Sequence, residues 1–130
     1  MPLVDTWAWV EYFQGSPLGA RVRPFIEGPD VFTSVLTLAE LSDVYERDSR
    51  PGLDDRVAFI RSRGPILGVT NRGAHRAGKT KWRQRKSGHP LGLADAIIYE
   101  TAQEHGLEML TGDKGFKGLP GVRLIGSKTG

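Results

Sequence analysis

The segment Leu3-Val4-Asp5-Thr6-Trp7, residues 3–7, joins the end of an apolar run to the start of a helix. The run Pro2–Asp5 is typical of a buried strand that ends in an acid. Helical character follows over Trp7–Phe13 and stops at Gly15-Ser16-Pro17. A strand that leads directly into a helix favours an α/β domain, with Asp5 at the point where the chain leaves the sheet.

The same alternation continues along the chain. Further strands are expected at 31–34, 66–69, 107–110 and 122–125, and further helices at 22–27, 36–45, 53–63 and 93–105. Asn71 is expected to cap one more helix, which ends before Gly88-His89-Pro90, and Gly106 is expected as the C-cap glycine of the helix at 93–105. This order predicts an α/β fold with a central, mostly parallel sheet flanked by helices.

Length and composition suit one domain, which we expect to span residues 1–126, with residues 127–130 as a flexible tail. Hydrophobic residues make up 38% of the chain, enough for a core, and the absence of cysteine excludes disulfides and thiolate metal sites. The sequence shows no signal peptide, and no apolar run approaches the roughly 18 residues of a membrane span. We therefore expect a soluble cytoplasmic protein with no membrane partner.

Two acids stand at the ends of expected strands. Asp5 ends the first strand, and Asp113 follows a later one in Leu110-Thr111-Gly112-Asp113. The C-terminal ends of parallel strands lie on one side of a sheet, where ligands bind. Asp5 and Asp113 can therefore converge although they are far apart in the sequence.

Two further acids interrupt the apolar stripes of helices. Glu40 is in line with Leu36 and Val44, and Asp95 is in line with Ile98 and Ala102. A capping or dipole-stabilising role would also place an acid near a helix N-terminus. Two such acids in addition to two strand-end acids instead favour a cluster of four carboxylates.

Clustered carboxylates repel one another, and a divalent cation removes that repulsion. Hard oxygen ligands favour Mg²⁺ or Mn²⁺, and such a centre can activate a water and stabilise the charge that develops on a phosphodiester. The sequence therefore predicts a metal-binding catalytic site formed by Asp5, Glu40, Asp95 and Asp113.

The net charge is only +3, but its distribution is uneven. No Asp or Glu occurs between Asn71 and Ala94, and the same stretch holds 7 of the 18 basic residues. Such a block indicates a polyanion partner, although a solvated helix face has the same composition. The candidate contacts are Arg72, Arg76, Lys79, Lys81, Trp82 and Arg83. Trp82 could stack on a nucleic-acid base or anchor its own helix.

Four segments resemble those of PIN-domain proteins, and most closely the VapC toxins of type II toxin–antitoxin systems. They are Leu3-Val4-Asp5-Thr6-Trp7, Thr37-Leu38-Ala39-Glu40-Leu41, Leu91-Gly92-Leu93-Ala94-Asp95-Ala96 and Leu110-Thr111-Gly112-Asp113-Lys114-Gly115-Phe116. Each is short, but they occur in order over nearly the whole chain, and no acidic position departs from the pattern.

The resemblance implies a PIN-like fold and a Mg²⁺- or Mn²⁺-dependent endoribonuclease, with RNA as substrate, an antitoxin protein as partner and commonly a homodimer. By position, Asp5 and Asp95 would be the principal metal ligands and Glu40 and Asp113 would complete the set. Thr6 and Thr111 match polar positions beside the site. The chain between Arg72 and Pro90 is not diagnostic of the family, so the resemblance does not name which RNA is the substrate.

Other functions fit the sequence less well. A haloacid-dehalogenase-like phosphatase would need a second Asp two positions after Asp5, where Trp7 stands. A receiver domain would need adjacent acids near the first strand and a lysine after the last. Two alternatives remain open within the same fold: a housekeeping PIN nuclease of RNA processing and a non-catalytic RNA-binding domain.

Overall fold

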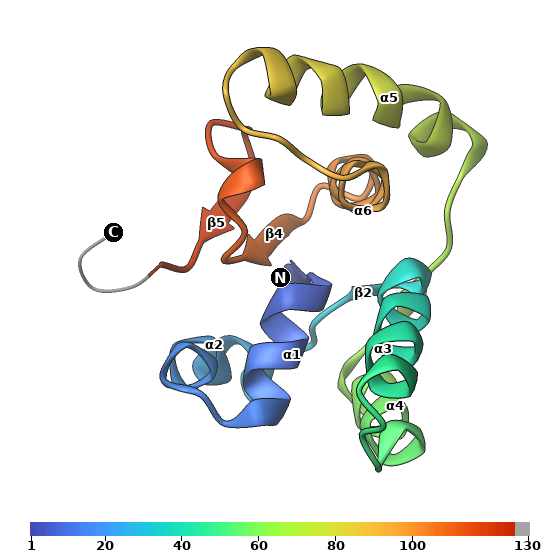
Figure 1. Ribbon diagram of the computed structural model, residues 1–130, viewed down its shortest axis with the longest axis vertical. Coiled ribbons are helices and arrows are strands. Elements are labelled where there is room, and N and C mark those ends of the chain that lie inside the picture. The colour runs from blue at the N-terminus through green and yellow to red at the C-terminus, as the bar shows by residue number, and fades with distance from the viewer. Residues whose placement is uncertain (127–130) are drawn as a thin grey trace.

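The sheet is parallel throughout and has β1 at its centre (Figure 1). Its strands are β1 (Pro2–Val4), β2 (Thr33–Ser34), β3 (Ile66–Leu67), β4 (Glu108–Thr111) and β5 (Val122–Leu124). β1, β4 and β5 form one hydrogen-bonded group, and β2 and β3 form a second. A bridge between Leu3 and Phe32 joins them, with the Val4 amide donating to the Phe32 carbonyl at 2.9 Å. The order across the sheet is therefore β3-β2-β1-β4-β5.

Helices cover both faces of this sheet in the computed structural model, which describes residues 1–126. They are α1 (Thr6–Gln14), α2 (Pro17–Ile26), α3 (Val35–Arg47), α4 (Leu53–Arg63), α5 (Asn71–Lys86) and α6 (Leu93–Glu104), with a 3-10 turn, η1 (Lys114–Phe116). In Figure 1, α5 and α6 lie on one side of the strands and α1 to α4 lie on the other. None of the helices within residues 1–126 combines the length and apolar character needed to cross a membrane.

Neighbouring residues of β1 and β4 enter different cores because side chains alternate between the faces of a strand. Leu3 and Met109 pack with α5 and α6, whereas Val4 and Leu110 pack with α1, α2, α3 and α4. All four side chains are fully buried. A strand covered on both faces is a continuous apolar run in the sequence, which is why the start of the chain predicted a buried parallel strand.

The predicted fold class, a mostly parallel α/β sheet flanked by helices, is confirmed. Two local expectations were wrong. The second helix begins at Pro17 and not at Val22, because Ser16 caps it by accepting a hydrogen bond from the Gly19 amide at 2.9 Å. Thr70, and not Asn71, caps α5, since its hydroxyl accepts from the Gly73 amide at 3.0 Å. The predicted tail, 127–130, lies outside the described residues.

Gly19 offers a test of how tightly α1 and α2 pack. A Cβ at Gly19 would lie 2.1 Å from the Glu11 carbonyl oxygen, so Gly19→Ala must push backbone apart. We expect it to lower the free energy of unfolding by about 1–3 kcal/mol, as overpacking does. Gly78→Ala is the matched control, because its Cβ meets nothing within 4 Å inside α5, and it should stabilise the protein by about 0.5–1 kcal/mol. Urea denaturation of both variants measures this, and equal effects would contradict the packing.

Candidate metal centre

Asp5 lies where β1 ends and α1 begins, and it is buried, with only 3% of its surface exposed. It caps α1, since its Oδ1 accepts a hydrogen bond from the Ala8 amide at 3.0 Å. Burial raises the pKa of Asp5 to about 7, against the lowering effects of hydrogen bonds from Thr111 and Ala8, and the charges of Asp95 and Asp113 raise it further. At neutral pH this carboxyl is therefore balanced between its charged and neutral forms.

Asp95 lies half-buried in the first turn of α6. Burial raises its pKa to about 6, and the charges of Glu40 and Asp113 add to the effect, while a backbone hydrogen bond at Gly92 lowers it. Asp113 therefore interacts electrostatically with both Asp5 and Asp95, and Glu40 interacts with Asp95. The structure brings Asp5, Asp95 and Asp113 within electrostatic range of one another and Glu40 within range of Asp95.

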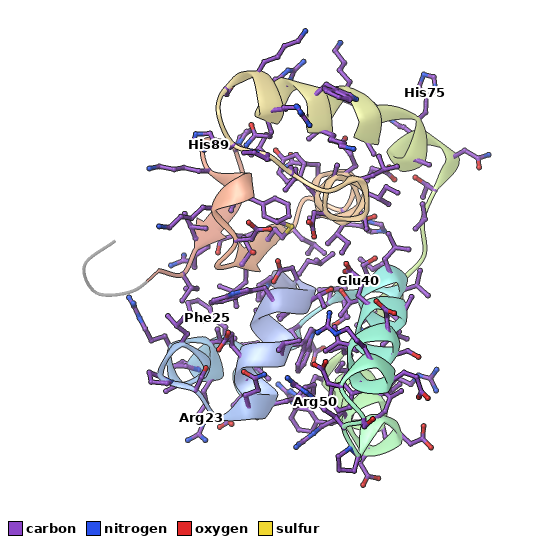
Figure 2. All side chains as sticks on the ribbon, viewed as in Figure 1. Arg23, Phe25, Glu40, Arg50, His75 and His89 are labelled. Carbon is purple, nitrogen blue, oxygen red and sulfur yellow. The ribbon has the colours of Figure 1, made fainter. Side chains whose placement is uncertain are left out.

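Glu40 lies on the side of α3 that faces α1 (Figure 2). Its Oε1 accepts a hydrogen bond from the Thr6 hydroxyl at 2.6 Å, and the same hydroxyl lies 3.0 Å from Thr37 Oγ1. Thr6 begins α1 directly after Asp5. The hydrogen bond therefore fixes a carboxylate of α3 against the first turn of α1.

Asp113 lies in the loop between β4 and η1. Its amide donates to Thr111 Oγ1 at 3.0 Å, and its Oδ1 accepts from the Gly115 amide at 2.8 Å. The indole ring of Trp7 lies on the preceding residue, Gly112, where a Cβ would come within 2.2 Å of the ring. Only glycine fits there, so the first turn of α1 and the Asp113 loop are in direct contact.

The donor chemistry of this cluster fits a hard divalent cation. None of the four acids forms an ion pair with a Lys, Arg or His among residues 1–126, whereas Glu27, Asp48, Glu100 and Glu108 do. Hard carboxylate oxygens with uncompensated negative charge are what Mg²⁺ and Mn²⁺ select. As the side chains stand within the described part of the chain, no three acids or histidines are close enough to form a ready metal-binding group. Binding would therefore require carboxylates to turn toward a shared point.

The basic block lies apart from the acids, along α5. One face of α5 is buried and carries Gly73, Ala77, Thr80 and Gln84. The arginines Arg72, Arg76 and Arg83 line a cavity of about 620 Å³ between α5 and α6. No Lys or Arg is among the groups that shift the pKa of Asp5 or Asp95. The four acids and the basic side chains of α5 therefore lie in separate parts of the structure.

Trp82 does not anchor its helix, because 52% of its surface is exposed. Lys81 Nζ lies 5.5 Å from its ring centre and the Arg85 guanidinium lies 5.2 Å from it. A shallow hollow beside it is lined by Lys79, Trp82, Arg83 and Lys86. An exposed aromatic ring surrounded by cations is suited to stacking on a base. His75 and His89, near the two ends of α5, lie away from Glu40 (Figure 2).

Two residues beside the centre were not singled out from the sequence. The ring of Trp7 packs against the core on the α1 side of the sheet and also lies on the loop that carries Asp113. Gln84 was overlooked inside the basic block, yet it is buried and bonds to the turn after Asp113. Its spacing from Gly73, Ala77 and Thr80 would have placed it on the inner face of the helix.

Residues 3–122 match the model of the PIN domain family. No curated protein matches the chain. A chain of a toxin–antitoxin complex from Klebsiella pneumoniae is 26% identical, with a TM-score of 0.75 over 96% of this chain and 98% of that one.

Two more solved structures share the fold at lower identity. VapBC2 from Rickettsia felis, bound to a DNA fragment from its promoter, is 16% identical, with a TM-score of 0.71 over 96% of this chain and 97% of that one. VapC20 from Mycobacterium tuberculosis, a toxin that cleaves the sarcin–ricin loop, is 20% identical, with a TM-score of 0.69 over 95% and 99%.

The raised pKa of Asp5 predicts how stability depends on pH. Between pH 4 and 7 the folded protein keeps a proton that the unfolded chain has lost, so the free energy of unfolding should fall as the pH rises through this window. A shift from 3.8 to about 7 corresponds to at most about 4 kcal/mol. Asp5→Asn should remove the part of this dependence that is due to Asp5 and leave the smaller part that is due to the raised pKa of Asp95, measured by thermal unfolding in EDTA. The control Asp30→Asn, at an exposed loop position, should keep it. Equal pH profiles for the two variants would contradict the assignment.

Proposed function

Because this chain belongs to the PIN-domain family, we propose that it is a Mg²⁺- or Mn²⁺-dependent endoribonuclease and the toxin of a type II toxin–antitoxin pair. The observation that carries the proposal is the cluster of four carboxylates with no cationic partner among the described residues. Its similarity to a toxin–antitoxin complex and to a toxin that cleaves RNA supports the biological role.

In this proposal Asp5 and Asp95 are the principal metal ligands, with Glu40 and Asp113 completing the set. The bound cation would supply an activated water and stabilise the charge on the phosphodiester. Thr6 holds the Glu40 carboxylate, and Thr111 accepts from the Asp113 amide while it bonds to Asp5. These hydroxyls hold the acids in the metal-free protein, and the carboxylates would turn toward a shared cation when the metal binds.

The RNA-binding surface of the proposal is α5. Arg72 and Arg83 would hold backbone phosphates along the cavity beside α6, with Lys79 and Lys81 adding charge, and Arg76 would exchange its ion pair with Glu100 for a phosphate. Trp82 would stack on an unpaired base, since its ring is exposed and flanked by cations. Stacking suits single-stranded RNA, whose bases are free to leave the helix.

The proposed partner is a cytoplasmic antitoxin protein, and the toxin itself is proposed to form a homodimer. An antitoxin could inhibit by presenting an Arg or Lys to the unpaired carboxylates, because a guanidinium or ammonium would neutralise the charge that otherwise attracts the metal. The nuclease domain of the proposal is residues 1–126.

Asp95→Asn tests the catalytic assignment. It removes one negative ligand and one source of repulsion, so the variant should fold at least as stably as wild type but lose RNA cleavage by at least about 100-fold, the upper range for loss of a metal-site partner. Cleavage of a labelled RNA with added Mn²⁺, with and without EDTA, measures this. Asp43→Asn, an exposed acid of α3, is the control and should cleave normally. Activity in a folded Asp95→Asn variant would exclude the site.

The same pair of variants tests the toxin role in cells. Expression of wild type or Asp43→Asn should slow growth and degrade RNA, whereas Asp95→Asn should not. Co-expression of the protein encoded in the adjacent reading frame should restore growth and yield a stable complex. Normal growth despite cleavage by the purified protein would favour a housekeeping PIN nuclease, and binding of RNA without cleavage would favour a non-catalytic domain.

The role of α5 is tested by salt dependence. Replacing Lys79 and Arg83 with Gln should weaken RNA binding and lower the slope of log K against log salt by roughly 1.4, about 0.7 for each phosphate contact on a single strand. The control is a double variant, Arg47→Gln with Arg61→Gln, which removes the same amount of positive charge from α3 and α4. An unchanged slope in the Lys79 and Arg83 variant would show that α5 is a solvated face.

A further inference from the structure

Gln84 is a polar residue on the inner face of the most basic helix. Only 4% of its surface is exposed. Its Nε2 donates two hydrogen bonds, to the Gly115 carbonyl at 2.8 Å and to the Lys117 carbonyl at 3.0 Å. Both hydrogens of one side-chain amide are therefore bonded to backbone oxygens of the turn that follows Asp113.

The backbone of Gly115 is held from two directions. Its carbonyl accepts from Gln84, and its amide donates to Oδ1 of Asp113 at 2.8 Å. Gln84 thus acts on the Asp113 carboxylate through one residue. A displacement of the turn would also displace the amide to which Asp113 is bonded.

The same turn is packed against the segment that leads to Asp95. A Cβ at Gly115 would lie 2.6 Å from the Pro90 carbonyl oxygen and 3.1 Å from the Leu91 side chain. Because Gly115 is in close contact with residues 90 and 91, its position affects the approach of α6 as well as the Asp113 loop. The hydrogen bonds of Gln84 therefore hold the junction between two of the acidic segments.

We propose that Gln84 is a positioning residue for the metal centre, which fixes Asp113 through the backbone of Gly115 and links α5 to that centre. The role rests on the proposed function, since it concerns the orientation of a metal ligand. Residues that orient metal ligands typically change metal affinity or activity by 10–100-fold when they are replaced. Through Gln84, a movement of α5 on binding RNA would be passed to Asp113.

Gln103 provides a matched comparison. It also donates through Nε2 from a helix to a loop carbonyl, that of Pro120, at 2.9 Å. That loop lies beyond η1, and Gln103 bonds to no residue of the acidic segments. Methionine has nearly the shape of glutamine but cannot donate, so the variants Gln84→Met and Gln103→Met each remove one donor group from a helix.

The experiment measures Mn²⁺ affinity by calorimetry without RNA, and amide hydrogen exchange of residues 113–117 in the metal-free protein. Gln84→Met should weaken Mn²⁺ binding by about 10-fold or more and speed exchange in this turn, while Gln103→Met changes neither. Saturating Mn²⁺ should restore much of the cleavage rate of Gln84→Met, because the ligands themselves are intact. If Gln84→Met does not fold, Gln84→Asn, with the same amide on a shorter stem, should show the same changes to a smaller degree.

Unchanged Mn²⁺ affinity in a folded Gln84 variant would overturn the inference, as would an equal loss in Gln103→Met. Failure of the proposed metal site is distinguishable, because wild type would then bind no Mn²⁺ at all. In that case, faster amide exchange confined to residues 113–117 of Gln84→Met would still show that Gln84 holds the turn. Unchanged exchange would show that Gln84 does not hold the turn either.

Discussion

Repulsion among carboxylates gathered at one edge of a parallel sheet is the constraint on which the rest of this structure depends. The sheet directs Asp5 and Asp113 to the same edge, and α3 and α6 bring Glu40 and Asp95 beside them. Within the described residues no Lys, Arg or His forms an ion pair with the four. Protons can relieve the repulsion, which adds to burial as a cause of the raised pKa of Asp5, and a hard cation can relieve it more completely.

A cluster of this kind is maintained only if the surrounding structure resists the repulsion between the carboxylates. Apolar cores on both faces of the sheet supply it, since Leu3 and Val4 are buried in different cores directly before Asp5. Close contacts then fix the loops: Trp7 lies on Gly112, and Gln84 bonds to the turn after Asp113. These contacts hold the acids near one another in addition to the hydrogen bonds that their own carboxylates accept.

The sequence was informative where a residue type conflicted with its surroundings. Asp5 after an apolar strand and Asp95 on an apolar stripe both stood out, and the PIN-like fold and family implied by the resemblance of the four segments are confirmed. Thr70 could not be told from Asn71 as a helix cap, because either side chain can accept the hydrogen bond and only the backbone geometry decides. Gln84 did not stand out because its neighbours in sequence are polar, and its partner carbonyls lie about 30 residues away.

Two of the three carboxylates of α6 show how one helix can leave one acid without a cationic partner and pair another. Asp95 and Glu100 are five residues apart, about 7.5 Å along the helix axis. Glu100 is buried, but it accepts from the Thr80 hydroxyl at 2.7 Å and lies 3.5 Å from Arg76 Nε. Its charge is therefore compensated by α5. Asp95 has other carboxylates as neighbours, and its pKa is raised. Had the basic helix packed against the first turn of α6, an arginine would occupy the oxygens that the proposed cation needs. Because Arg76 of α5 pairs with Glu100, Asp95 has no cationic partner among residues 1–126. The positive charge of α5 nevertheless lies on the same side of the sheet as Asp95, so a long polyanion could contact both.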